Sequence, residues 1–259
     1  MNLQSAYEYC RHKTARPGSS FYYSILFYPE QVRCDLLALH AFGTELEEII
    51  YECSDPAVMQ MKLAWWQDEI TRVYQHAARH PVGLVLDKVI SRHGLQQHQL
   101  LQLISNLEQI NSMTQLRTWL DLQKFLSGGP GLLWQLSADI CGHQDPGTMT
   151  LAVEMGSLFS CFQILHQAVL PDTGLVAQIK SSNSVSPVQE IQERLEHNCN
   201  IFPLVDRPTQ LHLLIMGHII IKCCHEVLRN NPQQGQRVML TPLRKLWIAW
   251  RLQRRYRST

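Results

Sequence analysis

Four glutamates lie close together within one predicted helix: Glu45, Glu47, Glu48 and Glu52. Side chains three or four residues apart in a helix lie on the same face, so their carboxylates can point toward a common ion. Oxygen ligands of this kind are the ones that Mg²⁺ prefers. The segment is therefore the first candidate for a metal site in this chain.

These glutamates divide between two faces of the helix. Glu47 and Glu48 share one face with His40, whereas Glu45, Glu48 and Glu52 follow one another at i, i+3 and i+7 on a second face. One residue step turns a helix by about 100°. We therefore expect Glu45 and Glu52 to point away from the Glu47 face and to form a solvated acidic surface.

Histidine and cysteine are common in the chain, but their spacing does not predict a zinc or disulfide site. The chain has 12 histidines and 8 cysteines, without an HExxH pattern or a CxxC pair. We expect the histidines to be ordinary helical residues and the cysteines to be small buried side chains in a reducing compartment. With a net charge of +1, the chain also lacks the basic field that attracts nucleic acid.

The last predicted helix, over residues 241–257, carries six basic residues and no acidic one. Leu243, Leu246, Trp247 and Trp250 follow the spacing of a single apolar face. A basic amphipathic helix with tryptophan can lie on an anionic membrane surface. The same face can instead pack onto the rest of the domain and leave the basic side chains in water, and the sequence does not choose between these arrangements.

Apolar residues recur with the period of an α-helix along most of the chain, and no convincing strand alternation occurs. We predict an all-α, single-domain protein over residues 1–259. Its helices are expected near 3–12, 29–52, 55–78, 81–93, 96–111, 116–141, 145–169, 187–197, 208–230 and 241–256. Asp55-Pro56, Asp145-Pro146 and Ser186-Pro187 each predict a helix start, and the polar residues 171–186 predict a loop.

The sequence predicts a cytoplasmic protein, for which peripheral contact with a membrane through residues 241–257 is one of the two arrangements left open above. No segment has the roughly 20 uninterrupted apolar residues of a membrane span. The longest apolar run, Leu211–Ile221, contains His212 and His218 and predicts a buried helix. The N-terminal residues lack the apolar core of a signal peptide.

Three ordered segments resemble the squalene/phytoene synthase family: SSFYYSILFY (19–28), LLALHAFGTELEEI (36–49) and KLAWWQDEITRVY (62–74). The resemblance continues more weakly through HPVG (80–83), GPGLLW (129–134) and residues 151–169. It implies a class I isoprenoid (trans-prenyl) synthase-like helical bundle around a central cavity. In that family, two farnesyl-type or geranylgeranyl-type diphosphates condense head to head, and magnesium ions bridge two aspartate-rich helices and the diphosphate.

The first aspartate-rich motif of the family is only partly present. The resemblance places the family tyrosine at His40, the arginine at Thr44, the paired aspartates at Glu47 and Glu48, and the last aspartate at Tyr51. Two carboxylates are kept, but the partner one turn after Glu47 is a phenol, and the arginine that binds diphosphate is lost. Glu47 and Glu48 are therefore expected to bind metal only if the chain is an active enzyme.

The second motif has lost its carboxylates. The resemblance places the family asparagine at Gln163, the arginine at His166, the aspartate at Gln167, and the acidic pair at Leu170 and Pro171. A neutral amide is a poor ligand for Mg²⁺. Because a diphosphate without a counter-ion is costly in an apolar cavity, this motif argues against catalysis.

Six residues are candidates for contact with a substrate or ligand, as the resemblance implies: Ser19, Ser20, Phe21, His40, Gln163 and Gln167. The two serines also suit a helix cap or a turn. Pro130, in the glycine-rich stretch 127–131, predicts a kink that changes the wall of the cavity. Trp65 and Trp66, in the KLAWWQDEI segment, are both expected to be buried.

The sequence favours a non-catalytic scaffold or assembly protein that needs no cofactor and binds a protein partner, an isoprenoid or a lipid. Within the family, the mitochondrial complex I assembly factor is similar in kind, because it too keeps the helical shell and departs from the aspartate motifs. The alternative is an active prenyl transferase with Mg²⁺ on Glu47 and Glu48, with Gln163 and Gln167 as weak ligands and with a squalene-like or phytoene-like product. A third hypothesis is a simple isoprenoid carrier.

Overall fold

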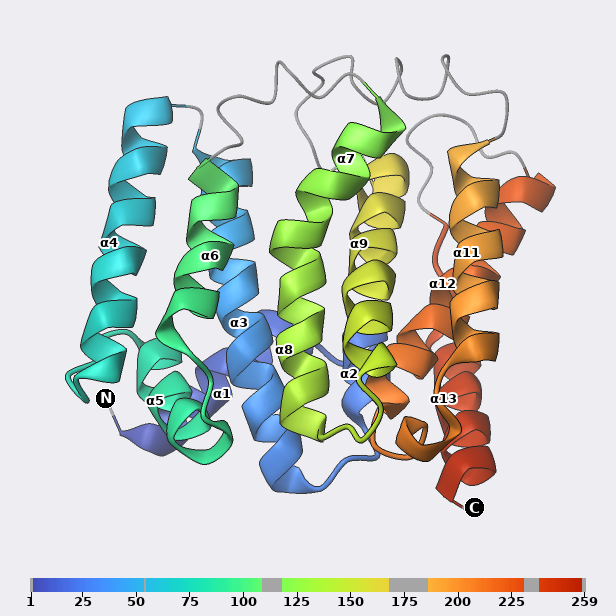
Figure 1. Ribbon diagram of the computed structural model, residues 1–259, viewed down its shortest axis with the longest axis horizontal. Coiled ribbons are helices and arrows are strands. Elements are labelled where there is room, and N and C mark those ends of the chain that lie inside the picture. Colours follow the sequence, from blue (N-terminus) through green and yellow to red (C-terminus); the bar gives the residue numbers. More distant parts are fainter. Residues whose placement is uncertain (1, 54, 109–117, 168–185, 231–237, 258–259) are drawn as a thin grey trace. The chain divides into compact units, whose positions relative to one another are not determined.

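The structure, a computed structural model, describes residues 2–53, 55–108, 118–167, 186–230 and 238–257 (Figure 1). The regular elements in these ranges are all helices, without a strand, so the predicted all-α class is confirmed. The chain forms two compact units, Met1–Pro17 with Tyr28–Met113 (unit 1) and Gly18–Phe27 with Thr114–Thr259 (unit 2). Each unit is described by itself, and the single domain over residues 1–259 stays a prediction.

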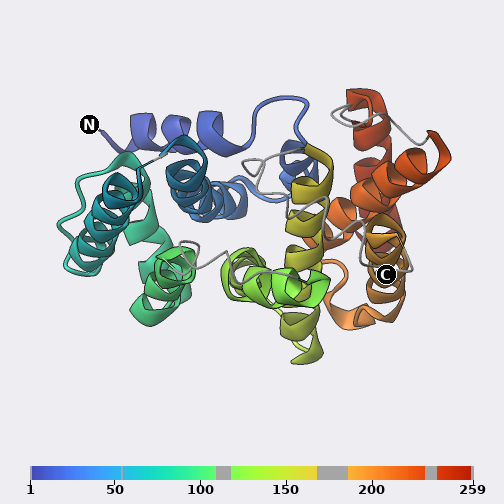
Figure 2. The ribbon, with the colours of Figure 1, turned by 90° about the horizontal axis from the view of Figure 1, so that it is seen from above.

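Unit 1 is built around α3 (Glu30–Glu52). This helix contacts four other helices of the unit: α1 (Leu3–Thr14), α4 (Pro56–Tyr74), α5 (Pro81–His93) and α6 (Gln97–Glu108). In Figures 1 and 2, α3, α4 and α6 run alongside one another, while α1 lies crosswise to them. Leu36, Leu39 and Phe42 of α3 are fully buried, so the apolar face of this helix forms the centre of the unit.

Unit 2 is centred on two long helices that pack on each other, α9 (Gly147–Gln167) and α12 (Leu211–Asn230). α9 also contacts α7 (Trp119–Leu126), the π-helical turn η2 (Ser127–Gly131), α8 (Leu132–Cys141) and α11 (Pro187–Ile201). α12 also contacts α11, α2 (Ser20–Ile25) and α13 (Pro242–Arg257). The short 3₁₀ turn η3 (Leu204–Asp206) precedes α12 in the chain.

Side-chain caps explain where several helices begin. Asp55 accepts a hydrogen bond from the Ala57 amide at 2.8 Å, directly before α4. Thr118 and Asp121 form a reciprocal capping box at the start of α7. Because such caps satisfy amides that have no partner inside the helix, they fix the first turn. The predicted helix start at Asp55-Pro56 is thus confirmed.

Two helix predictions need correction. The predicted helix over 55–78 is too long, because α4 ends at Tyr74 and His76 adopts a left-handed φ of 56° that a helix cannot continue. The sequence also did not predict α2, a helix of 6 residues, whose length is too short to show a clear period. The predicted loop lies outside the described residues over 171–185.

Three fully buried carboxylates have structural partners. Asp35 receives hydrogen bonds from Arg92 at 2.5 Å and His93 at 2.9 Å. Glu69 of α4 accepts the backbone amide of His80 at 2.7 Å, just before α5. Asp206 accepts the Thr148 hydroxyl at 2.6 Å. Since buried charges need such partners, these carboxylates hold helices together within their units and are not candidates for a metal site.

Pro130 does not break the helical path in which it lies, since the chain runs from α7 through η2 into α8. A π-helical turn accommodates a residue without a backbone N–H. A β-carbon at Gly131 would lie 2.8 Å from both the Ser157 Oγ and the Val153 carbonyl oxygen, so glycine is needed for η2 to approach α9 this closely. The predicted effect on a cavity wall stays a prediction.

Two helices are long and apolar enough to cross a membrane by length and composition alone: Gly147–Leu165 and Leu211–Asn230. However, 72% and 67% of their most apolar windows are buried within the protein. A core helix of a globular unit shows this same combination, so the evidence for a membrane span is weak. The burial of Leu211, Ile215 and Ile219 confirms the helix predicted from the Leu211–Ile221 run, while the predicted location in the cell stays a prediction.

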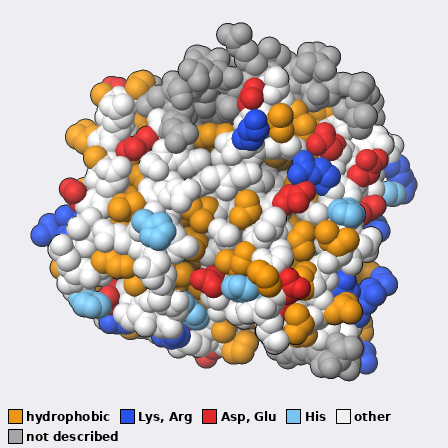
Figure 3. Space-filling view, in the orientation of Figure 1, with side chains coloured by type: hydrophobic (Ala, Val, Ile, Leu, Met, Phe, Trp, Pro, Cys, Tyr) orange, Lys and Arg blue, Asp and Glu red, His pale blue; other side chains and the backbone are white. Residues whose placement is uncertain are grey.

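The exposed surface is chemically mixed. On the face drawn in Figure 3, hydrophobic, basic and acidic side chains are interspersed, in keeping with the net charge of +1. Four large apolar side chains nevertheless lie exposed on one helix, α13: Leu243, Leu246, Trp247 and Trp250.

Candidate functional site

The predicted site residues fall into two sets, one in each unit. His40, Glu47 and Glu48 lie on α3 of unit 1. The second set belongs to unit 2: Ser19, Ser20 and Phe21 at the start of α2, with Gln163 and Gln167 on α9. The side chain of Gln167 lies outside the described part of the chain. The structure therefore shows each set within its own unit, and the assignment of these residues to substrate or metal stays a prediction.

The carboxylates of α3 are held by two side chains of α1. Lys13 Nζ lies 3.0 Å from Glu45 Oε1 and also forms an ion pair with Glu48. The Tyr9 hydroxyl donates a hydrogen bond of 2.5 Å to Glu45. We call Tyr9, Lys13, Glu45 and Glu48 the lysine–glutamate cluster. Its lysine is an ion-pair partner of both glutamates.

The prediction of a solvated acidic face is wrong for Glu45. Its side chain is only 14% exposed, because α1 packs across this side of α3. Glu48 is 41% exposed and shares Lys13 with Glu45. The period of α3 indicated the direction in which Glu45 points, but it contained no signal for the helix that covers it.

Contacts within the lysine–glutamate cluster change the pKa values of Lys13 and Tyr9. Burial by itself lowers the pKa of Lys13, but hydrogen bonds to Glu48 and Glu45 outweigh burial and raise it. Burial and the hydrogen bond to Glu45 raise the pKa of Tyr9 to about 12. Lys13 therefore stays charged and Tyr9 stays a hydrogen-bond donor at neutral pH.

The other two α3 candidates are poorly suited to bind a cation or an anion. Burial, with a smaller contribution from the charge of Glu48, raises the pKa of Glu47 to about 7, so near neutral pH much of it is uncharged. Burial lowers the pKa of His40 to about 3, so this imidazole is neutral. A partly protonated carboxyl group attracts a cation less than an ionised one, and a neutral imidazole does not supply the positive charge that a diphosphate needs.

A pocket of about 200 Å³ opens beside the lysine–glutamate cluster, lined by Glu45, Glu48, Ile49, Lys62, Trp65 and Trp66. The Trp66 ring packs edge-on against Phe42 and His80, with centroids 5.3 and 4.9 Å apart. Trp66 is 4% exposed, as predicted, but the predicted burial of Trp65 is wrong, because Trp65 is 42% exposed. The pocket thus has an aromatic wall and a charged wall.

The candidates at the start of α2 have structural contacts. Ser19 Oγ accepts a hydrogen bond from the Tyr22 amide at 3.1 Å and caps α2. Phe21 lies edge-on to Trp134 of α8, with ring centroids 6.1 Å apart. The alternative role of a helix cap is therefore confirmed for Ser19. No contact of these residues with a ligand is tested by the structure.

On α9, Gln163 is half-buried between the buried side chains of Phe162 and Ile164. Residues 155–171 contain no Asp, Glu, Lys or Arg. This face of α9 consequently offers an amide among apolar side chains and lacks the charges that a magnesium-bound diphosphate requires.

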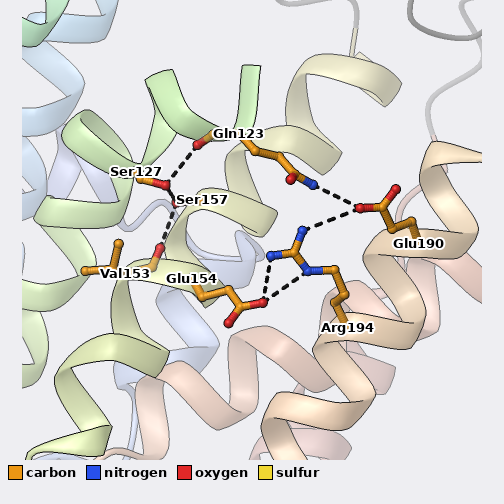
Figure 4. Close-up of polar contacts among 7 residues, drawn as sticks. All are labelled: Gln123, Ser127, Val153, Glu154, Ser157, Glu190 and Arg194. Atoms are coloured by element: carbon orange, nitrogen blue, oxygen red, sulfur yellow. Dashed lines mark hydrogen bonds and ion pairs between the residues drawn. The ribbon is translucent and has the colours of Figure 1, made fainter. Parts of the chain in front are cut away.

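A second pocket, of about 370 Å³, lies on the opposite side of α9, and sequence reasoning missed it. Its lining is formed by Gln123, Ser127, Gln135, Thr150, Val153, Glu154, Ser157, Leu158 and Arg194. Glu154 precedes Gln163 by nine residues, which turns it about 180° around the helix. Figure 4 shows Arg194 of α11 reaching between Glu154 and Glu190, and Ser157 meeting Ser127 of η2. We call this the α9–α11 pocket.

The charges of the α9–α11 pocket are paired with one another. Arg194 Nη2 lies 2.7 Å from Glu154 Oε1, and Arg194 Nη1 lies 3.5 Å from Glu190 Oε1. One guanidinium thus faces two carboxylates, which leaves no positive charge in excess for an anion. The i, i+4 spacing of Glu190 and Arg194 is visible in the sequence, but their contact with α9 is not.

Among the described residues, no group of three or more His, Cys, Asp or Glu side chains is arranged to hold a metal ion. The side chains that correspond to the first aspartate-rich motif also do not fit Mg²⁺. Glu48 is paired with Lys13, and Tyr51 stands where the resemblance places the last aspartate of the motif.

Comparison with known proteins identifies the family. The family model described as squalene/phytoene synthase matches residues 14–172. The chain belongs to the squalene/phytoene synthase family. This match includes α3 and α9, the two helices that correspond to the aspartate-rich motifs.

Curated relatives of this family member are named NADH dehydrogenase (ubiquinone) complex I, assembly factor 6. The Bos taurus protein is 25% identical over 138 residues, which is 53% of this chain and 41% of the relative. The Homo sapiens protein is 24% identical over 138 residues, again 53% and 41%. The chain therefore matches less than half of the length of these relatives.

Two solved structures share the fold of this family member. A dehydrosqualene synthase in complex with a ligand superposes with a TM-score of 0.78 and 15% identity, covering 99% of this chain and 98% of that chain. The squalene synthase HpnC from Alicyclobacillus acidocaldarius gives 0.67 and 16%, covering 88% and 95%. The predicted isoprenoid synthase-like helical fold is thus confirmed, while its central cavity stays a prediction.

Proposed function

We propose that this squalene/phytoene synthase family member is a non-catalytic scaffold that acts in the assembly of a protein complex. The observation that carries this proposal is the lysine–glutamate cluster, in which Lys13 binds Glu45 and Glu48. A protein cation occupies the carboxylate that the family mechanism would give to a metal. The helical shell is kept while the charges needed for diphosphate ionisation are neutralised or absent.

Electrostatics supports the loss of catalysis at both motifs. A diphosphate with its magnesium ions requires several carboxylates free to bind metal. On α3 one candidate is paired and the other is driven toward its neutral form, and on α9 the position of the family aspartate holds Gln167.

The assembly role is supported by the relatives that are named for it. Two of them, from cow and human, are called complex I assembly factors, and they share with this chain a stretch of 138 residues. We propose a protein partner in complex assembly on this basis. An isoprenoid or lipid ligand is a further part of the proposal, since the fold is shared with a ligand-bound dehydrosqualene synthase.

Incubation with farnesyl or geranylgeranyl diphosphate and Mg²⁺, followed by extraction of products, tests the loss of catalysis. We expect no squalene-like or phytoene-like product from the wild-type chain or from a Glu47→Gln, Glu48→Gln variant. Product from the wild type that disappears in the double variant would establish the competing prenyl transferase. The substitution removes charge but little volume, so the fold is expected to survive.

Complementation tests the assembly role. Cells that lack the chain are expected to accumulate incompletely assembled NADH dehydrogenase complex on native gels, and the Glu47→Gln, Glu48→Gln variant is expected to restore assembly. Trp66→Ala is the control, because loss of a buried tryptophan costs about 3–5 kcal/mol and should abolish rescue. Normal assembly in cells without the chain would disprove this part of the proposal.

A further inference from the structure

Helix α13 exposes apolar side chains on successive turns. Leu243 is 77% exposed, Trp247 is 54% exposed and Trp250 is 44% exposed. Leu246, on the same side, is 37% exposed. Large aromatic side chains are costly to leave in water, so a cluster of this kind marks a surface that binds something.

A different face attaches α13 to unit 2. Ile248, Ala249 and Leu252 are buried, and the helix packs on α12 and α2. Lys245, 2% exposed, donates a hydrogen bond of 2.9 Å to the Gly18 carbonyl. The alternative in which the Leu243–Trp250 face packs onto the domain is therefore wrong, because the helix is anchored by its other side.

Basic side chains lie beside the exposed tryptophans. The Arg251 guanidinium lies 5.3 Å from the centre of the Trp247 ring, and that of Arg254 lies 4.9 Å from the Trp250 ring. Arg255 is exposed as well, and residues 241–257 contain no Asp or Glu. In Figure 3, basic and hydrophobic side chains gather at the lower right, where Figure 1 places α13.

We propose that this exposed side of α13 binds the surface of an anionic phospholipid bilayer, with the helix lying in the interface. We call it the α13 surface: Leu243, Leu246, Trp247, Trp250, Arg251 and Arg254. Tryptophan places an apolar ring at the level of the headgroups, while arginine extends its charge toward phosphates and buries its stem. The combination suits a lipid headgroup region better than an uncharged surface.

Charge complementarity selects this occupant over a second copy of the chain. The α13 surface contains two arginines and no Asp or Glu, so pairing it with an identical surface would bring like charges together. An anionic bilayer instead offers charge of the opposite sign. Each basic residue near such a surface strengthens binding by roughly fivefold.

Vesicle co-sedimentation of the full chain tests the proposal. We expect binding to vesicles of phosphatidylcholine with about one third phosphatidylglycerol to be at least tenfold stronger than to pure phosphatidylcholine. Raising the salt concentration should weaken it, because exposed charges are screened within about 8 Å at physiological ionic strength. Two variants, Trp247→Ala with Trp250→Ala and Arg251→Gln with Arg254→Gln and Arg255→Gln, should each lose at least tenfold.

Matched controls separate the α13 surface from general effects of charge and hydrophobicity. Arg11→Gln with Arg79→Gln and Lys124→Gln removes three exposed charges from other elements. Met61→Ala with Leu120→Ala removes two apolar side chains that are 67% and 56% exposed. Both controls should bind within twofold of the wild type, and thermal melting should show that every variant is folded.

Three results would overturn the proposal. Binding to both vesicle types alike, or to neither, would show that the surface does not recognise anionic lipid. A loss of binding in the controls as large as in the α13 variants would show that the effect is not local. A concentration-dependent dimer without vesicles that Trp247→Ala with Trp250→Ala abolishes would identify a second copy as the occupant.

Discussion

The lysine–glutamate cluster of unit 1 and the α9–α11 pocket of unit 2 both pair one basic side chain with two glutamates, but they differ in burial. Lys13 and Glu45 are 17% and 14% exposed and only Glu48, at 41%, is open to solvent, whereas Arg194, Glu154 and Glu190 are all 33–36% exposed. Interactions between charges weaken as solvent reaches them. The comparison suggests that the first set of charges is part of the fold of its unit, while the second adds little to its stability.

The largest loss of stability is expected at the close contact between η2 and α9, beside the α9–α11 pocket, and not at the charges of that pocket. Gly131→Ala would place a β-carbon 2.8 Å from the Val153 carbonyl oxygen, so η2 and α9 must move apart. We expect a loss of about 3 kcal/mol in the free energy of unfolding, since a clash with a backbone atom is relieved only when a whole helix shifts. Urea denaturation followed by circular dichroism measures it.

Gly147→Ala is the matched control for that change. Its added β-carbon would lie 3.0 Å from the Asp145 Oδ1 atom, the end of a flexible side chain, so we expect a much smaller loss. Equal losses in the two variants would show that η2 is not held closely against α9. The comparison would then rest on the ion pairs alone.

The next largest effect is expected from the lysine–glutamate cluster. Lys13→Met keeps the apolar stem and removes the charge, leaving Glu45 and Glu48 without their shared cation. We expect a loss of about 1–2 kcal/mol, less than for a fully buried pair because Glu48 is 41% exposed. Lys88→Met, which removes a lysine that is 52% exposed, should change stability much less in the same urea titration.

Much of the scaffold around these sites was predictable from the sequence. The apolar period and the Asp55-Pro56 cap predicted α3 and the start of α4 within a residue or two, because local spacing and capping determine where a helix begins. The hydrogen bond from the Arg79 amide to Glu69, ten residues earlier, was not predicted. This contact depends on the turn between α4 and α5, which the sequence pattern does not specify.

Contacts between distant segments account for most of what the sequence did not predict. Lys13 and Glu48 are 35 residues apart, and Glu154 and Arg194 are 40 residues apart. Helix period predicts the direction of each side chain but not the element that packs against it. The same reason explains why Trp65 and Trp66, adjacent in sequence, are exposed and buried respectively.

The raised pKa of Glu47 predicts that the free energy of unfolding depends on pH. Its pKa rises from an ordinary value of 4.5 to about 7 in the folded protein, so the unfolded chain ionises first as pH increases. Stability from this group is therefore fully present below pH 4.5 and is lost as pH rises through about 7. Glu47→Gln should remove that loss, making the variant about 1–2 kcal/mol more stable than wild type at pH 8 but not at pH 4.5.

Unfolding by urea at several pH values measures this difference directly. A constant stability difference between wild type and Glu47→Gln from acid to alkaline pH would contradict the raised pKa.

The smallest effect is expected when the α9–α11 pocket loses its cation. Arg194→Gln removes contacts of 2.7 and 3.5 Å to Glu154 and Glu190, yet all three side chains are about one third exposed. Ion pairs at such positions contribute about 0–1 kcal/mol, so we expect a loss below about 1 kcal/mol that disappears in high salt. The loss in Lys13→Met should persist in the same salt, because burial limits screening. If Arg194→Gln proved as destabilising as Lys13→Met, and equally insensitive to salt, the two sets of charges would play the same structural role despite their different exposure.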